Sequence, residues 1–144
     1  MWRVLRLAAA TGLCASKNSM LRNTSTCSEP LALGAKRGCP RVVYPLVAEA
    51  GFDMGLETVP SRSRVPLHFH DDKDEVIIVL RGTASINING EEARAGCGDL
   101  VFIGRGQSHE IRNEGDDELL FSWSFSPSKA TFAASLTAKD LDLV

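Results

Sequence analysis

Apolar and polar residues alternate along most of the chain between residues 41 and 126, in short runs separated by Gly-rich or polar segments. Alternation with a period of two is typical of β-strands, which send successive side chains to opposite faces. In the clearest run, at residues 118–125, every second residue is large and apolar: Leu119, Phe121, Trp123 and Phe125. We therefore expect strands, with such faces packed in a core.

The pattern predicts roughly eight strands between residues 40 and 128, at the close spacing typical of all-β domains. They are expected at residues 41–47, 51–60, 66–70, 75–82, 83–90, 100–103, 109–113 and 118–125. The Asn89-Gly90 pair favours a type I′ hairpin turn. The sequence thus indicates an all-β sandwich or barrel in place of alternating βαβ units.

Three segments follow from this pattern. Residues 1–38 form an N-terminal extension with a targeting or disordered character, and residues 39–128 form the barrel. Residues 129–144 form a C-terminal tail that could hold one short helix with an apolar stripe: Phe132, Leu136, Leu141 and Leu143. Pro and Gly between residues 30 and 41 indicate a linker into the barrel.

The first 28 residues contain four basic side chains, whereas the first acidic residue is Glu29. Basic, Ser/Thr-rich and acid-free composition is typical of an organelle transit peptide, so we favour a mitochondrion or plastid. Two alternatives stay open. One is a secretory signal whose short apolar stretch runs from Leu7 to Ala15, and the other is a tail without an address, which would leave the chain cytoplasmic.

The composition limits the kinds of partner that are expected, but it says little about the chemistry. The 144 residues are 44% hydrophobic and 24% charged, with a net charge of −2. No basic stripe is present, so nucleic acid is not expected as a partner. No run of about 18 apolar residues is present, so no membrane span is expected. The four cysteines do not form a disulfide framework, because three of them precede the predicted barrel or lie at its start.

All three histidines lie in two short segments, His68-Phe69-His70 followed by Glu75, and His109 further on. On a strand, residues i and i+2 share a face, so the first two imidazoles can converge on one ion. A polar bend lets Glu75 return to the same place, whereas His109 must be brought there by the fold. Three imidazoles and one carboxylate suit one divalent ion: Fe, Mn, Ni, Cu or Zn.

Two motifs carry a family resemblance across roughly residues 62–113. The first has His-x-His, a Glu and a closing Gly, matched here by His68, His70, Glu75 and Gly82, with Arg62 in place of the leading Gly. The second is matched by Gly98, Gly106, His109 and Asn113, with Gly104 in place of a Pro. Fifteen residues separate the motifs. In these residues the chain resembles the cupin superfamily, especially its small single-domain members.

The resemblance implies a jelly-roll barrel, or double-stranded β-helix, with His68, His70, Glu75 and His109 as metal ligands. It also implies a small-molecule partner and a homodimer. Arg105 and Gln107, on the loop before His109, are candidate substrate contacts, although a plain solvent-facing role is favoured for both.

The ligand set favours a metalloenzyme acting on a small organic molecule. Oxygenase or oxidase chemistry comes first, because no acid or base beyond the ligands is evident from the sequence. Decarboxylases and isomerases share the fold, so it does not select a reaction. The alternative is a non-catalytic cupin that binds or senses a small ligand.

Overall fold

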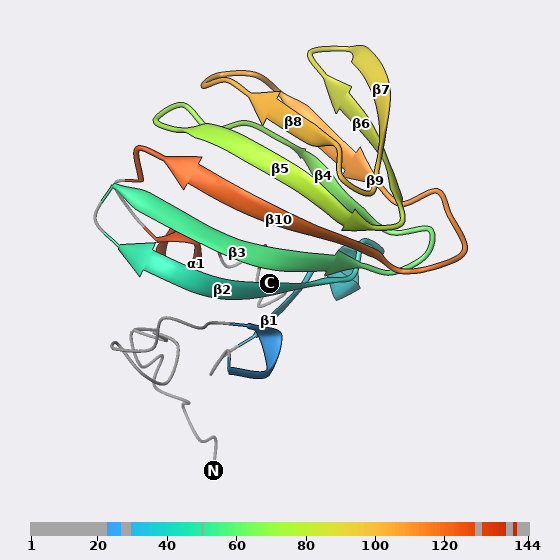
Figure 1. Cartoon of the computed structure of the whole chain (residues 1–144), viewed down its shortest axis with the longest axis horizontal. Helices are drawn as coiled ribbons and strands as arrows, with labels where there is room; N and C mark the ends of the chain where they lie inside the picture. Colours follow the sequence, from blue (N-terminus) through green and yellow to red (C-terminus); the bar gives the residue numbers. More distant parts are fainter. Residues whose placement is uncertain (1–22, 27–29, 50, 129–130, 138–139, 141–144) are drawn as a thin grey trace.

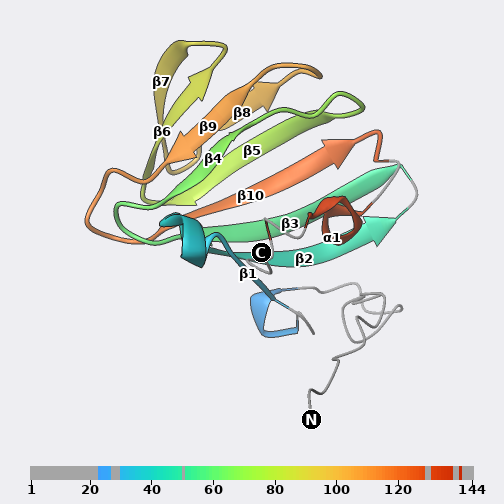
Figure 2. The same cartoon turned by 180° about the vertical axis from the view of Figure 1, so that it is seen from behind.

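Antiparallel β-sheets make up most of this chain. The computed structural model describes residues 23–26, 30–49, 51–128, 131–137 and 140. The larger sheet, in spatial order, comprises β1 (Leu31–Leu33), β2 (Arg41–Glu49), β3 (Phe52–Val59), β10 (Leu119–Ser126), β5 (Asp74–Arg81) and β8 (Leu100–Ile103). The smaller one comprises β4 (Arg64–His68), β9 (His109–Arg112), β6 (Thr83–Ile88) and β7 (Glu91–Gly96). This two-sheet arrangement confirms the all-β jelly-roll prediction (Figures 1 and 2).

The predicted strands appear close to their expected positions. β4 begins at Arg64, before the expected start at Pro66, and ends at His68, so His70 lies just beyond the strand. The hairpin between β6 and β7 turns at Asn89 and Gly90, whose φ angles of 52° and 92° are those of a type I′ turn. The linker expected at 30–41 instead contains β1, which pairs with β2.

Two departures from the family motifs, Arg62 and Gly104, fall in turns. Arg62 takes the place of a Gly and adopts a left-handed φ of 61° in the turn between β3 and β4. A residue with a Cβ pays an energetic penalty in this region, which glycine avoids. Gly104 follows β8, and its backbone N–H donates to Gln107 Oε1 at 2.6 Å. The turns therefore form without the family residues.

One buried apolar cluster joins the two sheets. The predicted apolar face of β10 is buried, and it meets Ile77 and Val79 of β5 and Ile86 and Ile111 of the smaller sheet. Full burial of a side chain of this size contributes about 2 kcal/mol to stability. The alternation noted in the sequence therefore does mark the inward side of this central strand.

The inward side of β3 is the polar one. Phe52 is 42% exposed, whereas Asp53 and Glu57 are buried on the alternate positions. Between them, Gly55 has no side chain because an ideal Cβ there would lie 2.5 Å from the Trp123 ring and 2.4 Å from the Tyr44 carbonyl oxygen. Asp53 and Glu57 of β3 therefore both lie on the interior side, with Gly55 between them.

Short helical turns flank the sheets at both ends of the chain: η1 (Thr24–Thr26), η2 (Ala35–Arg37) and α1 (Phe132–Ser135). The helix expected in the tail is thus a single turn, capped by the Thr131 hydroxyl, which accepts from the Ala134 N–H. Phe132 lies against the rings of Trp123 and Phe125. Leu141, Leu143 and most of the predicted targeting segment lie outside the described residues.

Candidate metal centre

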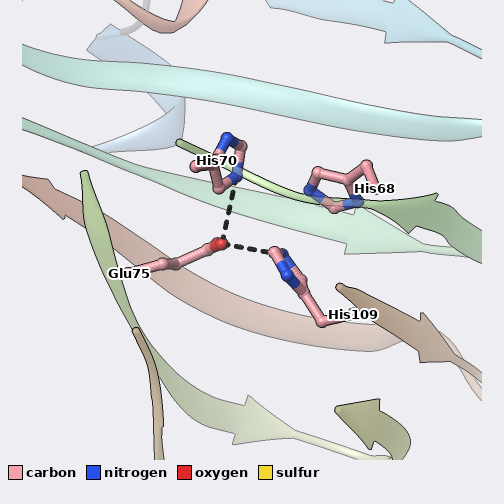
Figure 3. A group of neighbouring side chains, drawn as sticks. All are labelled: His68, His70, Glu75 and His109. Carbon is pink, nitrogen blue, oxygen red and sulfur yellow. Dashed lines mark ion pairs between the residues drawn. The ribbon is translucent and has the colours of Figure 1, made fainter. Parts of the chain in front are cut away.

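The fold brings together four donors that are far apart in the sequence. His68 ends β4, His70 follows it, Glu75 is the second residue of β5, and His109 begins β9. One donor atom from each residue lies within 4.8 Å of those from the other three. Figure 3 shows Glu75 between His70 and His109, with His68 beside them. The smaller sheet aligns two of these histidines, because His68 pairs with His109 in the β4–β9 ladder.

Two backbone carbonyls orient the imidazoles. His68 Nδ1 lies 2.8 Å from the Pro66 carbonyl oxygen, and His109 Nδ1 lies 2.9 Å from that of Gln107. A carbonyl oxygen only accepts hydrogen bonds, so Nδ1 carries the proton in both rings and donates it. Each Nε2 is then left with a lone pair for a metal ion, which is the usual arrangement around protein-bound metals.

Polar atoms of this group are buried without a hydrogen-bond partner. Glu75 Oε2 lies 3.1 Å from His109 Nε2 and 3.4 Å from His70 Nε2, yet none of these three atoms makes a properly oriented hydrogen bond. Buried polar atoms are nearly always satisfied in native proteins. A divalent ion bonded at about 2.0–2.3 Å to each donor would satisfy all of them at once. The residues present therefore fit a metal ion.

The electrostatics hold two of the donors, His68 and Glu75, in their ligating forms, whereas Glu75 favours a proton on His109 that a metal ion would displace. Burial lowers the pKa of His68 to about 4, so its ring is neutral at pH 7. Burial alone would raise the pKa of Glu75, but the neighbouring His109 and His70 outweigh it and lower that pKa to about 2. For His109, burial is outweighed by Glu75, and its pKa is raised. A charged carboxylate facing imidazole rings is the protonation pattern that a cation requires.

A cavity of about 300 Å³ opens beside the donors, with His68, His70 and Glu75 in its wall. Its apolar lining includes the aromatic rings of Phe121, Trp123, Phe125 and Phe132. The aromatic face of β10, expected to be core packing, thus serves as both core and cavity wall. A cavity of this size lies at the lower end of the range for small-molecule sites.

A charged pair that the sequence reasoning missed completes the wall. Arg41 of β2 and Glu57 of β3 both line the cavity, are 7% and 5% exposed, and approach to 3.0 Å between Nε and Oε1. Burial raises the pKa of Glu57 to about 8, although Arg41 opposes the shift. The detectable signal was the alternation in β3, where Asp53 and Glu57 share a face with Gly55 and Val59.

Arg105 and Gln107 are not among the cavity-lining residues. The backbone and side chain of Arg105 both bond to the Asp74 carboxylate, at 2.9–3.3 Å. Gln107 closes its own turn through Gly104, and its carbonyl orients His109. Their role as substrate contacts therefore stays a prediction, while their observed contacts hold the loop that leads into β9.

The sequence matches known proteins across the segment that holds all four donors. The family profile described as a Cupin domain matches residues 55–125. Tetracenomycin polyketide synthase protein TcmJ of Streptomyces glaucescens is 32% identical over 80 residues, covering 56% of this chain and 53% of that protein. An oxalate-binding protein of Thermotoga maritima is 35% identical over 63 residues, covering 44% and 52%. The chain therefore spans about half the length of these relatives.

Solved structures share the fold. A protein of Thermotoga maritima described as a predicted oxalate decarboxylase superposes with a TM-score of 0.68 at 24% identity, covering 76% of this chain and 100% of that one. A Klebsiella pneumoniae protein with a double-stranded β-helix domain gives a TM-score of 0.62 at 17% identity, covering 78% and 93%. In the described part of this chain, no helix has both the length and the apolar character needed to cross a membrane.

Proposed function

Since residues 55–125 place this chain in the cupin superfamily, we propose that it is a metalloenzyme that holds one divalent ion and acts on a small organic molecule. The observation that carries the proposal is the buried donor group of His68, His70, Glu75 and His109, which opens onto a cavity of about 300 Å³. A closed structural site would have no such cavity beside it.

Four protein donors leave one or two positions of a five- or six-coordinate ion for substrate. When bound, such an ion would polarise a substrate oxygen or, if redox-active, exchange electrons with it. The protein's own part is visible in the contacts. The carbonyls of Pro66 and Gln107 fix two rings, and aromatic side chains line the cavity beside the donors.

Among possible reactions we place oxygenase or oxidase chemistry first, with Fe or Mn as the ion, because it demands the fewest protein groups. The presence of Glu57 in the cavity wall improves the case for decarboxylation or isomerisation, both of which need a positioned acid or base. The T. maritima relative described as an oxalate-binding protein supports including oxalate among the first molecules tested.

The experiment starts with the metal. Purified protein is analysed for bound elements beside His109→Ala, which removes one donor at a fully buried position. We expect close to one equivalent in the parent and a small fraction in the variant. Full occupancy in His109→Ala would contradict the site. Oxygen uptake is then measured with Fe and Mn loaded separately, over organic acids including oxalate, phenols and thiols.

A non-catalytic ligand-binding role is the second candidate, favoured by the name of the same T. maritima relative. The two functions separate on one comparison. A molecule that stabilises the metal-loaded protein in a thermal melt but is recovered unchanged after prolonged incubation indicates a binder. Turnover of any tested molecule that depends on the added metal indicates an enzyme.

We also propose a homodimer formed through the outer side of β5 and β8. Leu100 and Phe102 are 60% and 61% exposed, and they pair with Ile78 and Val76, so their side chains form one apolar strip with Leu80. Exposed apolar patches commonly mark contacts between proteins. Sedimentation analysis of the parent should give a dimer, and Phe102→Asp should give a monomer with unchanged metal content.

Organelle targeting by the acid-free N-terminal segment remains a proposal that rests on its composition. A fluorescent protein fused to residues 1–38 should enter a mitochondrion or plastid, whereas a fusion to residues 39–144 should stay outside. Diffuse distribution of both fusions would contradict targeting.

A further inference from the structure

Buried polar atoms without hydrogen-bond partners occur in two places among the described residues. One set belongs to the metal donors. The other set comprises Arg41 Nε and Nη1, Asp53 Oδ1, Glu57 Oε1 and Trp123 Nε1. Arg41, Glu57 and Trp123 all line the same cavity as the donors. Each unpartnered buried group costs about 1–3 kcal/mol, so three of them around one cavity point to a missing polar ligand.

Among the residues that the structure describes, Glu57 is the one close ion-pair partner of Arg41, and it compensates the positive charge poorly. Arg41 Nε and Glu57 Oε1 lie 3.0 Å apart, but neither atom has hydrogen-bond geometry toward any group. A guanidinium stays protonated in proteins, and burying a charge without a well-oriented counter-ion is unfavourable. Its planar fork of donors is suited to a carboxylate, which can accept two parallel hydrogen bonds.

The surroundings of Glu57 weaken its role as that counter-ion. Burial is the largest cause of its raised pKa of about 8, and the charge of Glu75 adds to it, while Arg41 opposes both. The other charged or titratable groups in the cavity wall are Arg37 of η2, Asp140 of the tail, and His68 and His70 beside β4. Burial therefore favours the neutral, protonated form of the Glu57 carboxyl group, which can itself donate a hydrogen bond.

The aromatic lining of the rest of the cavity favours a planar ligand. The rings of Phe121, Trp123, Phe125 and Phe132 line it, with Phe125 and Phe132 parallel to within 3° at 6.3 Å between centroids. Planar aromatic surfaces bind flat apolar bodies by stacking and by excluding water. A small dicarboxylate such as oxalate would leave these four rings without an apolar partner.

We propose that the Arg41–Glu57 end of the cavity binds the carboxylate of a small aromatic carboxylic acid. Arg41 and Trp123 Nε1 donate hydrogen bonds to the carboxylate oxygens, the Glu57 carboxyl group lies alongside, and the aromatic rings enclose the planar body. The opposite end of the molecule then faces the donors of the metal centre. This inference deepens the proposed function, on which only that last orientation rests.

The test uses benzoate as the acid and benzamide as its neutral counterpart, with binding measured by titration calorimetry at pH 7 on the full chain stripped of metal. We expect benzoate to bind at least tenfold more tightly than benzamide and more tightly than oxalate. Arg41→Met, which keeps the length but not the charge, should weaken benzoate at least tenfold. The matched control is Arg81→Met, which removes an exposed arginine paired with Glu118 and should leave binding unchanged.

Trp123→Phe and Arg41→Lys keep the proposal testable if Arg41→Met does not fold. Trp123→Phe retains the aromatic ring and removes Nε1, so benzoate should weaken severalfold. Arg41→Lys keeps the charge but loses the fork, and should fall between the parent and Arg41→Met. Equal binding of benzoate and benzamide, equal binding by all folded Arg41 variants, or no benzoate binding at millimolar concentration would overturn the inference.

Metal content separates this outcome from that of the proposed function. Arg41→Met should keep the metal content of the parent, because Arg41 is not a donor. A parent protein that holds no metal but binds benzoate through Arg41 would contradict the metalloenzyme proposal and support the carboxylate site. A parent protein with a full metal complement and no preference for benzoate would contradict the carboxylate site and leave the metal proposal supported.

Discussion

Two buried glutamates of the cavity lining, Glu75 of β5 and Glu57 of β3, lie on either side of β10 in the larger sheet and differ in the direction of their pKa shifts. Glu75 faces His70 and His109, and its pKa falls to about 2. Glu57 faces Arg41, yet its pKa rises to about 8. Both carboxyl groups are about 95% buried, so burial alone does not decide the charge.

The difference lies in the number and placement of the neighbours. Glu75 has two imidazoles within 3.4 Å of one oxygen, and together they lower its pKa despite its burial. Glu57 has one misaligned guanidinium and lies within the field of Glu75 itself. A buried carboxyl group becomes a ligand where several donors surround it, and a proton-holding group where they do not.

Glu75→Gln should give the largest effect, because it removes the only negative donor of the metal group while keeping its shape. Changes to groups that merely support a ligand cost about 10–100-fold in metal affinity, so loss of a ligand should cost at least about 100-fold. The readout is a competition titration with a chelator. Glu57→Gln is the matched control and should retain the affinity of the parent; equal losses in both variants would erase the distinction between the two glutamates.

Gly55→Ala should produce the next largest effect, on stability. The new methyl would collide with the Trp123 ring and with the Tyr44 backbone, which must both move. Overpacking of this kind costs about 3 kcal/mol, seen as a lower midpoint in urea. Gly90→Ala tests the same change in open space, although strain at its φ of 92° adds a smaller cost. A Gly55→Ala protein as stable as the parent would show that the Glu57 wall is not tightly packed.

Glu57→Gln should change how stability depends on pH. The Glu57 carboxyl loses its proton near pH 4.5 when unfolded but only near pH 8 when folded. Between these values the folded state holds more protons, so the parent loses stability as pH rises, by at most about 1.4 kcal/mol per pH unit. Urea melts of metal-free protein from pH 5 to pH 8 should show a flatter profile for Glu57→Gln. Parallel profiles would mean that Glu57 is charged throughout.

Arg105→Ala should give the smallest effect. Its side chain meets Asp74 at a largely exposed position, where ion pairs add little, and its backbone bond to Asp74 survives the change. We expect metal affinity and benzoate binding within about threefold of the parent, since solvent screens such pairs. A larger loss of ligand binding would support the substrate contact predicted from the sequence for this loop.

The four metal donors could be predicted from the sequence because they belong to local patterns. His68 and His70 are two apart, Glu75 follows one polar bend, and His109 lies in a second motif at a set distance. Most strands also carry either an alternation or a short β-branched apolar run, which is why most of them fall where they were expected. These signals depend on neighbouring residues, so a single sequence displays them.

The Arg41–Glu57 pair could not be predicted in the same way. Arg41 and Glu57 belong to no motif, and they meet only because β2 and β3 pair with Val43 opposite Glu57. The alternation of β3 was visible, but it does not state which face points inward. On the polar side, which faces the interior, Gly55 lets the Trp123 ring approach the strand closely.

The segments that close the cavity come from outside the family-matched stretch. All four donors and Glu57 lie within residues 55–125, whereas Arg41 precedes that stretch and Phe132 follows it. Exchanging the two flanking segments between proteins of this architecture would therefore change which molecules the cavity binds, while the metal donors stay the same. Such a division lets one scaffold acquire new ligand specificities through changes in its terminal segments.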